Sequence, residues 1–372
     1  MPRPATTPDR TPVEANRQDG DEGDLGAHFQ RLIRRFGPIP LGQYMAEANA
    51  RYYAVRDPLG AAGDFVTAPE VSQMFGEMIG GWLADLRARA GRMDSAYVEL
   101  GPGRGTLARD SLRVLARAAG RPDVHLVEGS PVLRAAQSAL LGAVTHHDDI
   151  DTLPDDRPLL VVANEFFDAL PIRQLVKTAQ GWRERMVGLA GDVLVPVAGD
   201  RPMDAAVPAD LADAPDGALI ETCPAASAIM AALAERVAAQ GGAILAIDYG
   251  YEVLRHGSTF QAVARHQRTD PFAAPGTADL TAHVDFGALA SAARHGGLVV
   301  DGVAGQGDFL LSLGIGQRAA ALARANPAQA ESLATALHRL VDPAEMGTLF
   351  RVLAARSAAW PQSSGFAHAE SG

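Results

Sequence analysis

The stretch YVELGPGRGTLARD, residues 97–110, decides the fold of this chain. It opens with a short apolar segment typical of a buried strand and continues, after a turn, as an amphipathic helix. The turn carries Gly101, Gly103 and Gly105, and Glu99 lies two positions ahead of the first glycine. Glycines let a backbone approach a ligand where a Cβ atom would collide, and the following helix N-terminus favours negative groups. A merely tight turn is the alternative, but the strand–turn–helix context favours a cofactor site.

Strands and helices alternate around this turn. Strands are predicted at residues 95–100, 123–128, 159–164 and 241–250, and helices at 72–89, 106–119, 132–141, 225–239 and 284–294. The run LLVVAN at 159–164 is apolar almost throughout, as expected for a strand that a parallel sheet buries on both faces. The alternation therefore predicts an α/β fold with a mostly parallel sheet and right-handed crossovers.

The pattern departs from this alternation in two places. Residues 172–197 contain short strand-like segments that predict an antiparallel insertion, and a long loop is expected between the strand at 241–250 and the next helix. No clean linker separates these parts, so a single elaborated domain is expected over residues 25–356. Its parts are an N-terminal helical extension and lid (25–94), a cofactor-binding half (95–170) and the rest of the sheet with insertions (171–356), between disordered tails at 1–24 and 357–372.

The bulk composition excludes several classes of protein. The formal net charge of −11 argues against a general nucleic-acid binder. Cys223 is the only cysteine, which excludes an internal disulfide and a Cys-ligated zinc or iron–sulfur site. No apolar run approaches the roughly 20 residues of a membrane span, and the first residues lack the core of a signal peptide. We therefore expect a cytoplasmic bacterial protein without membrane insertion, and a homo-oligomer is compatible with the sequence.

The glycine spacing indicates which cofactor the turn holds. A dinucleotide fingerprint is G-x-G-x-x-G, whereas this turn is G-x-G-x-G, and the chain has no Walker A motif. An acid two residues ahead of such a turn is the form used by S-adenosyl-L-methionine-dependent methyltransferases. Glu128 ends the second predicted strand about 20 residues further on, where an acid can accept both ribose hydroxyls. NAD enzymes share that acid, so Glu128 supports a nucleoside without separating the two classes.

The sequence HHDD at 146–149 lies where a third strand should end. At this place an acid, either Asp148 or Asp149, can meet the adenine amino group. A metal site and a solvated turn are the alternatives, but adjacent side chains rarely converge on one ion. We therefore predict no metal centre and assign one of the two aspartates to the nucleoside.

Longer stretches resemble a known family, the MidA-type methyltransferases. They include GDFVTAPEVSQMFGEMIG, VELGPGRGTL, VEGSPVLRAAQ, NEFFDALP and TAHVDF, and the resemblance covers nearly the whole chain outside its tails. The resemblance implies a Rossmann-like, seven-stranded class I methyltransferase core that uses S-adenosyl-L-methionine. Family members include a mitochondrial complex I assembly factor that methylates a protein arginine, so a complex I subunit or similar protein is the implied partner. The expected cofactor-binding residues are Glu99, Gly101, Pro102, Gly103, Gly105, Glu128, Asp148, Asp149 and Asn164.

Two motifs supply candidates for the catalytic residues. NEFFD at 164–168 follows the fourth strand, where the transferred methyl group should lie, and we expect Glu165 to hold a guanidinium with Asp168 second. The alternatives are that Asp168 caps the next element and that Glu165 pairs with a structural arginine. In TAHVDF, His283 and Asp285 can supply a base and its orienting acid. Equally, Asp285 can cap the helix that follows while His283 is simply buried.

Further residues are expected around the acceptor and the cofactor. Asp248 and Tyr249 close the strand at 241–250 and are expected at the acceptor pocket, and the segment 63–67 is expected to form a lid over the cofactor.

The function predicted is protein arginine N-methylation. The alternatives are methyl transfer to an oxygen or nitrogen of a small molecule, and a non-catalytic assembly chaperone that keeps the cofactor fold. An NAD(P) oxidoreductase is disfavoured by the spacing of the loop.

Overall fold

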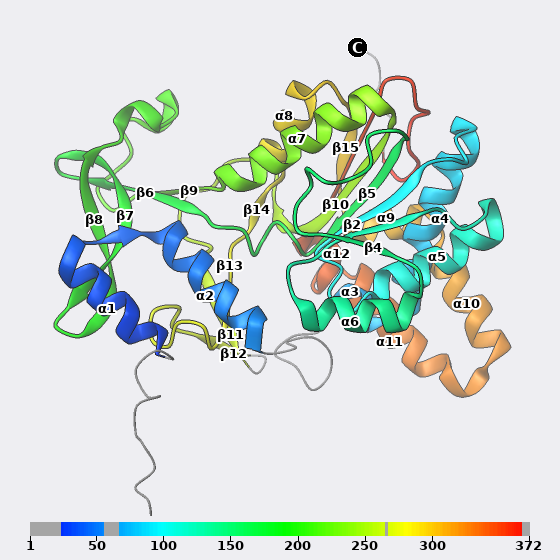
Figure 1. Ribbon diagram of the computed structural model, residues 1–372, viewed down its shortest axis with the longest axis horizontal. Coiled ribbons are helices and arrows are strands. Elements are labelled where there is room, and N and C mark those ends of the chain that lie inside the picture. Colours follow the sequence, from blue (N-terminus) through cyan, green and yellow to red (C-terminus); the bar gives the residue numbers. More distant parts are fainter. Residues whose placement is uncertain (1–23, 56–66, 265–266, 367–372) are drawn as a thin grey trace, which may run out of the picture.

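The computed structural model describes residues 24–55, 67–264 and 267–366, and its centre is a mixed β-sheet (Figure 1). The sheet has the strand order β15-β16-β10-β5-β2-β3-β4. Its strands are β2 (Ala96–Leu100), β3 (Val124–Val127), β4 (Thr145–His147), β5 (Leu159–Asn164), β10 (Gly242–Tyr251), β15 (Val299–Gly305) and β16 (Phe350–Arg356), and the short β14 (Val284–Asp285) pairs with β10. The first five in chain order run parallel, while β16 runs antiparallel between β10 and β15. The expected seven-stranded Rossmann-like α/β sheet is confirmed.

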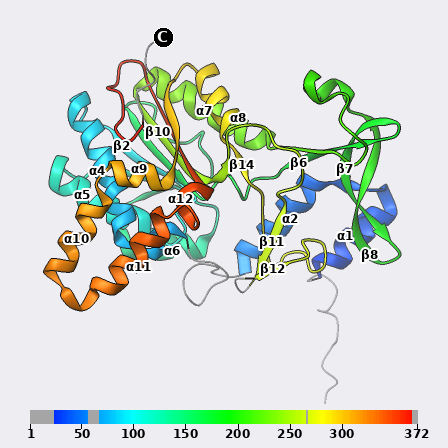
Figure 2. The same ribbon diagram turned by 180° about the vertical axis from the view of Figure 1, so that it is seen from behind.

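Helices cover both faces of this sheet, as Figures 1 and 2 show. They are α4 (Gln73–Ala90), α5 (Thr106–Ala119), α6 (Pro131–Leu141), α7 (Pro224–Gln240) and α8 (Phe286–His295). Consecutive residues of β5 enter opposite hydrophobic clusters: Leu160 and Val162 pack on the face covered by α4 and α5, whereas Val161 and Ala163 pack on the face covered by α7 and α8. Both faces of β5 are buried, which explains why its sequence is apolar almost throughout.

A second, antiparallel sheet lies beside the core and is joined to it through the insertion (Figure 1). Its strands are β1 (Ile39–Pro40), β6 (Arg173–Thr178), β7 (Gly181–Ala190), β8 (Val193–Pro202) and β9 (Leu219–Thr222), with the 3₁₀ turns η1 (Asp204–Ala206) and η2 (Ala209–Leu211). The helices α1 (Leu25–Phe36) and α2 (Leu41–Val55) pack on it through a cluster that includes Phe29, Tyr44 and Val187. The predicted antiparallel insertion is therefore confirmed, and the N-terminal helices belong to it.

A third sheet of three strands occupies the segment where a long loop was expected. Its strands are β11 (Gln261–Ala264), β12 (Gln267–Thr269) and β13 (Asp279–Thr281), and they pair antiparallel in the order β12-β11-β13. Asn49 of α2 binds β13 as a strand would, because its side chain donates to the Leu280 carbonyl at 2.8 Å and accepts from the Leu280 amide at 3.0 Å. The same amide group donates to the Ala169 carbonyl at 3.1 Å. Asn49 thus joins the N-terminal extension, the third sheet and the loop after β5.

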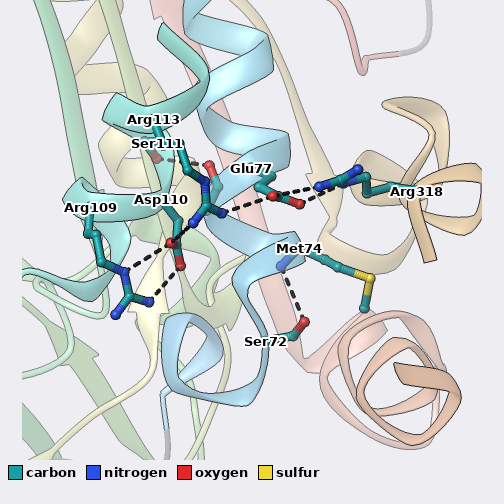
Figure 3. A network of polar contacts seen from close by, with 9 residues as sticks. Ser72, Met74, Glu77, Arg109, Asp110, Ser111, Arg113 and Arg318 are labelled. Carbon is teal, nitrogen blue, oxygen red and sulfur yellow. Dashed lines mark hydrogen bonds and ion pairs between the residues drawn. The ribbon is translucent and has the colours of Figure 1, made fainter. Parts of the chain in front are cut away.

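Among the C-terminal helices, α10 is fixed to the core by an ion-pair network around the buried Glu77 (Figure 3). The C-terminal helices are α9 (Gln306–Ser312), α10 (Ile315–Ala325), α11 (Ala330–Val341) and α12 (Met346–Leu349), with the turn η3 (Pro327–Gln329). Glu77 of α4 is buried and accepts two 2.8 Å hydrogen bonds from the guanidinium of Arg318 on α10. It also accepts one at 2.9 Å from Arg113 of α5, which in turn pairs with Asp110. One carboxylate therefore links three helices.

The two ends of the chain differ from the disordered tails predicted for residues 1–24 and 357–372. Residues 1–23 and 367–372 lie outside the described part, but Asp24 caps α1 by accepting from the Gly26 amide at 2.9 Å. Residues 357–366 pack against the core, so the prediction of disorder is wrong there. Trp360 is buried, and the indole of Trp82 donates to the Ser364 carbonyl at 3.0 Å. Within the described ranges, no helix has the length and apolarity needed to cross a membrane.

Candidate active site

A cavity of about 760 Å³ lies at the carboxyl ends of β2, β3, β5 and β10. In a parallel sheet this edge is where the loops that follow the strands converge, and ligands of such folds bind there. One half of the cavity is lined by the glycine loop and the residues after β3 and β4. The other half is lined by residues from the NEFFD turn, β10, α2 and the third sheet. The two halves can hold a cofactor and a second substrate side by side.

The glycine loop has the backbone geometry that its sequence predicts. Gly101 and Gly103 have φ values of 59° and 53°, and both line the cavity together with Pro102. A residue with a side chain is strained in this left-handed region. Gly105 has a different role from the one predicted, because it does not line the cavity. It precedes α5 as the N-cap residue, and a Cβ atom on it would lie 3.2 Å from Leu141. Gly105 therefore allows close packing between the loop and α6.

Glu99 lies under the loop in a nearly dry environment. It is 2% exposed, lines the cavity and accepts a hydrogen bond from the hydroxyl of Tyr97. Burial raises the pKa of Glu99 to about 8, although the bond from Tyr97 works in the opposite direction. A cation bound beside Glu99 would stabilise the carboxylate and lower this pKa. The position suits the amino group of a methionine moiety.

Glu128 follows β3 and faces the cavity, as predicted. One carboxylate oxygen accepts from the Ser130 amide at 2.8 Å and the other from Gln137 at 3.3 Å. Burial raises the pKa of Glu128, and these bonds oppose that shift. Two bonds from fixed groups therefore orient the carboxylate toward the cavity, where a ribose can donate to it.

Gln137 of α6 is a site residue that the sequence analysis missed. Its amide nitrogen donates to the Gly103 carbonyl at 2.6 Å as well as to Glu128. Its amide oxygen lies 2.9 Å from the ring nitrogen Nε2 of His146, which fixes the orientation of the amide. Gln137 is fully buried and connects the glycine loop to the ribose acid without lining the cavity. Its polarity in an otherwise apolar helix face is the signal that could have identified it.

Asp148 and Asp149 both line the cavity after β4, and the structure distinguishes them by their partners. Asp148 is exposed and pairs with Arg134 at 2.5 Å, whereas Asp149 accepts from the Asp151 amide at 2.9 Å. His147 lies 2.9 Å from His125, so the HHDD side chains diverge. No group of three or more metal-binding side chains is arranged to hold an ion in the described part of the chain.

Glu165 occupies an unusual backbone position in the acceptor half. Its φ of 49° makes it the only residue other than glycine with a positive φ among those described. Its carboxylate lines the cavity, accepts from the Ala68 amide at 3.1 Å and from Asn164 at 3.4 Å, and has its pKa raised to about 7 by burial. Asn164 also lines the cavity and is buried, but its amide oxygen has no hydrogen-bond partner in the described structure. The positive φ strains the backbone of Glu165. Backbone strain persists where surrounding contacts enforce it, and it is concentrated at functional sites.

Asp168 and Asp248 have different roles at the site. Asp168 lines the cavity, accepts from the Tyr249 hydroxyl and has its pKa raised to about 6 by burial. Asp248 was expected at the pocket but lies beneath it, fully buried and outside the lining. One oxygen of Asp248 accepts from the Phe167 and Asp168 amides, both at 3.1 Å. Asp248 therefore shapes the turn that presents Glu165 and Asp168, while Tyr249 lines the cavity as predicted.

His283 and Asp285 do not form the predicted pair of base and orienting acid. Asp285 begins α8 and accepts from the Ala288 amide at 2.9 Å, and it does not line the cavity. It is a helix cap, so its predicted catalytic role is wrong. His283 does line the cavity, and its ring lies against that of Tyr249 with centroids 5.3 Å apart. Burial lowers the pKa of His283, so its ring is neutral near pH 7 and can accept a proton.

The structure adds cavity residues that were not among the predicted site residues, and these come from the N-terminal extension and the third sheet. They are Tyr53, Glu70, Gln261, Arg268, Asp279 and Thr281. The hydroxyl of Tyr53 donates to Asp279 at 2.8 Å across more than 200 residues of sequence. Of the expected lid, Thr67 lines the cavity and residues 63–65 lie outside the described part of the chain.

Comparisons with known proteins agree with this arrangement. A family model described as "Putative S-adenosyl-L-methionine-dependent methyltransferase" matches residues 78–304. The chain belongs to this methyltransferase family. It is 34% identical to the protein arginine methyltransferase NDUFAF7 homologue of Drosophila melanogaster, over 93% of this chain and 88% of the relative. The human protein arginine methyltransferase NDUFAF7 is also 34% identical, over 88% of this chain and 82% of that protein.

A solved structure extends the likeness to the whole fold of this methyltransferase. The crystal structure of a protein from Burkholderia thailandensis, which contains bound S-adenosyl-homocysteine, superimposes on this structure with a TM-score of 0.79. The two sequences are 30% identical, and the match covers 92% of this chain and 93% of that one. The cofactor of the methyltransferase is therefore S-adenosyl-L-methionine. The cofactor half fits it, because Gly101 and Gly103 allow the left-handed backbone with which the loop lines the cavity, and Glu99 and Glu128 offer carboxylates to an amino group and a ribose.

Proposed function

We propose that this methyltransferase transfers a methyl group to the guanidinium of an arginine in a protein substrate. The observation that carries the proposal is the excess of carboxyl groups over basic groups among the described residues that line the cavity. Within residues 24–55, 67–264 and 267–366, the carboxyl groups that line it are those of Glu70, Glu99, Glu128, Asp148, Asp149, Glu165, Asp168 and Asp279, and the arginines are Arg104 and Arg268. A sulfonium cofactor and a guanidinium are both cations, and an excess of carboxylates in a confined cavity attracts both. The names of the relatives, protein arginine methyltransferases, support the same acceptor.

The reaction requires that one proton leaves the acceptor. A guanidinium is protonated in water and has no free lone pair. S-adenosyl-L-methionine supplies the methyl group on a sulfonium, and as the new N–C bond forms the S–C bond breaks with its electron pair left on sulfur. The cationic charge of the sulfonium is thereby lost, so charge balance requires the acceptor nitrogen to release one proton to a base.

Glu165 is the residue that we assign to this acceptor. Its backbone is held at a positive φ, and its carboxylate is fixed by the Ala68 amide at the start of α3 (Ala68–Val71). A carboxylate held in this way can orient a guanidinium and localise its charge. Because its pKa is raised to about 7, Glu165 can also take up the released proton near neutral pH. Asp168, with a pKa raised to about 6, and neutral His283 are the next proton acceptors along the same wall.

A methylation assay with purified protein tests the proposal. The enzyme is incubated with S-adenosyl-L-methionine and purified bacterial complex I subunits, the partner implied by the family resemblance, and methylarginine is read by mass spectrometry. Glu165→Gln should lower transfer by about 100-fold or more, the usual effect of losing a proton-transfer group, while cofactor affinity persists. Glu331→Gln, on the exposed surface of α11, is the matched control and should leave transfer unchanged.

Other products would contradict the acceptor while leaving the family assignment intact. Methyllysine, or a methylated small molecule without methylarginine, would overturn the arginine proposal. Unchanged transfer by Glu165→Gln would overturn the role of that residue. The cytoplasmic location expected from the sequence stays a proposal, and cell fractionation tests it.

A further inference from the structure

One face of the third sheet lines the acceptor half of the cavity. The residues on this face are Gln261 and Val263 of β11, Arg268 of β12, and Asp279 and Thr281 of β13. They alternate along β11 and β13, as side chains on one face of a sheet do. The strand register places Val263 opposite Asp279 on one side and opposite Arg268 on the other. Asp279, Val263 and Arg268 therefore form one row across the sheet.

This row runs from the inside of the cavity to its exposed rim. Asp279 is 5% exposed and Val263 is partly buried, whereas Arg268 is exposed together with the rest of β12. Because neighbouring strands lie about 4.8 Å apart, the backbones of Asp279 and Arg268 are separated by about 10 Å. The row thus has a carboxyl group at its inner end, an apolar side chain in the middle and a guanidinium at its outer end.

Arg268 has no anionic partner within the described part of the chain. No hydrogen bond or ion pair joins its guanidinium to a described carboxylate, although many carboxyl groups line the same cavity. Arginines that stabilise this fold are paired, as Arg318 and Arg113 are with Glu77. The guanidinium of Arg268 can therefore bind an anion from outside without giving up an ion pair inside the protein.

The positive charge of Arg268 acts on the acceptor half of the cavity. The pKa of His283 is lowered first by burial and then by the charges of Arg255 and Arg268. Arg255 is also exposed and lies between β10 and β11, outside the lining of the cavity. Two positive charges thus flank His283 on the exposed side of a cavity whose lining is otherwise rich in carboxyl groups.

A cation at the rim affects how a second cation approaches the cavity. An arginine surrounded by lysines and other arginines is repelled at the rim before it reaches the carboxyl groups inside. An arginine with an acidic neighbour brings its own carboxylate, which a guanidinium can bind through two parallel hydrogen bonds. Charged groups at the rim of an interface act mainly in this way, by attracting one class of partner and repelling another.

We propose that Arg268 selects protein substrates whose acceptor arginine has an acidic residue close to it in sequence, because Arg268 binds that carboxylate at the rim. This inference rests on the proposed arginine acceptor. The distance of about 10 Å across the row corresponds to about three residues of an extended peptide, so the acidic residue is expected within about three positions of the arginine. Arginines in basic segments are excluded as substrates by the same charge.

Four short peptides test the proposal with the full-length protein saturated with S-adenosyl-homocysteine. Three have a central arginine that is flanked on both sides by glutamate, by glutamine or by lysine, and the fourth has citrulline between glutamates. Fluorescence anisotropy measures the dissociation constant of each labelled peptide. The wild type should bind the glutamate–arginine peptide about fivefold more tightly than the glutamine peptide, the upper range for an exposed ion pair, and the lysine peptide least tightly. Added salt should reduce this preference.

Charge reversal at the rim identifies the residue responsible. Arg268→Glu should reverse the order, so that the lysine peptide binds more tightly than the glutamate–arginine peptide. Because Arg268 is exposed, the melting temperature and the affinity for S-adenosyl-homocysteine should not change. Arg268→Lys should keep the wild-type order with a smaller preference, since an ammonium lacks the planar fork of a guanidinium. Arg201→Glu is the matched control: Arg201 is exposed on β8 of the second sheet and does not line the cavity, so this variant should keep the full preference.

The outcomes separate this inference from the proposed function. If the wild type binds the glutamate and glutamine peptides equally, or if Arg268→Glu keeps the wild-type order, Arg268 does not select the substrate and the arginine acceptor is unaffected. Absence of measurable binding by all four peptides at millimolar concentration would overturn the inference as well. If the citrulline peptide binds the wild type as tightly as its arginine counterpart, the proposed arginine acceptor fails and this inference fails with it.

Discussion

The ring of Phe166 lies 3.0 Å from the position that a Cβ atom would occupy on Gly101. These residues follow β2 and β5, the adjacent central strands, so the first loop of the cofactor half is packed against the turn that carries Glu165. Any side chain on Gly101 has to displace the aromatic ring beside the acceptor residue. Because Gly101 has no side chain, the glycine loop of the cofactor half can pack directly against the turn of the acceptor half.

Gly101→Ala should weaken the binding of S-adenosyl-L-methionine by at least about tenfold, because the new Cβ atom displaces Phe166 and disturbs the loop. Titration calorimetry measures the effect. Gly91→Ala is the matched control: Gly91 has a φ of 65°, close to the 59° of Gly101, but a Cβ atom there meets nothing within 4 Å. Both variants should lose stability from backbone strain, Gly101→Ala should lose more because it also displaces Phe166, and only Gly101→Ala should lose affinity. Equal affinity in the two variants would contradict the loop assignment.

Glu128→Ala should remove charge-assisted hydrogen bonds to the ribose, each worth about 1.5–3 kcal/mol, and should raise the cofactor dissociation constant by at least about tenfold. Gln137→Met keeps the volume of the side chain but removes the donor that binds Glu128 and the Gly103 carbonyl. We expect this change to weaken cofactor binding as well, although Gln137 does not line the cavity.

The double variant distinguishes a positioning role for Gln137 from a purely structural one. If Gln137 acts through Glu128, the losses of affinity in the two single variants should not add in the double variant. Strictly additive losses would show that Gln137 supports the cofactor by some other route.

Glu165 should make the stability of the protein without ligands depend on pH in a recognisable direction. Its pKa is raised by burial from 4.5 to about 7, so between these values the folded protein binds a proton that the unfolded chain lacks. The stability contribution of this group is therefore present at low pH and decreases as the pH rises through about 7. Compared with the wild type, Glu165→Gln should gain free energy of unfolding at pH 8 relative to pH 4.5, as measured by urea denaturation. Asp168 and Glu99 also have raised pKa values in this region, and the charge of Asp168 itself contributes to the raised pKa of Glu165.

The ion-pair network of Glu77 should show the opposite pH dependence. Burial alone would raise the pKa of Glu77, but its bonds to Arg318 and Arg113 lower the pKa below 4.5. A lowered pKa stabilises the fold above pH 4.5, and the contribution disappears as the pH falls through the folded pKa. Glu77→Gln should cost about 2 kcal/mol at pH 7, a reduced estimate because both arginines are about 40% exposed, and less at pH 3. Asp94→Asn, which breaks the exposed pair with Arg92, is the control and should cost less than about 1 kcal/mol. A loss at pH 3 as large as at pH 7 would contradict an ionic origin.

The sequence predicted the central sheet because its signals are local. The run at 159–164 is buried on both faces, and α6, predicted at 132–141, begins at Pro131 after the cap residue Ser130. The third sheet was missed because its strands are three or four residues long, and every residue of β12 is exposed, so no alternation of apolar and polar residues marks it. Residues 357–366 were taken for a tail, yet Trp360 among them is buried against the core.

The site was predictable where a motif lies in one short segment. Gly101, Gly103, Glu128 and Glu165 line the cavity as expected. Asp285 was misassigned because a capping aspartate and a catalytic one look identical in sequence, and only its bond to the Ala288 amide separates them. Asp279 and Tyr53 carry no local signal, since their relationship exists only after α2 and β13 meet.

The bond between Asn49 and Leu280 joins residues 231 positions apart, and it therefore has a consequence for the synthesis of the protein. Proteins are made from the N-terminus, and a contact of such long range cannot form until most of the chain has left the ribosome. The segment 96–164 can already pair β2, β3 and β5 at that stage, since these strands are close in sequence. Nascent chains would then acquire the parts that bind cofactor well before the wall that receives the acceptor. An incomplete chain, such as one released by premature termination before residue 279, would lack β13 of that wall together with β15 and β16 of the central sheet.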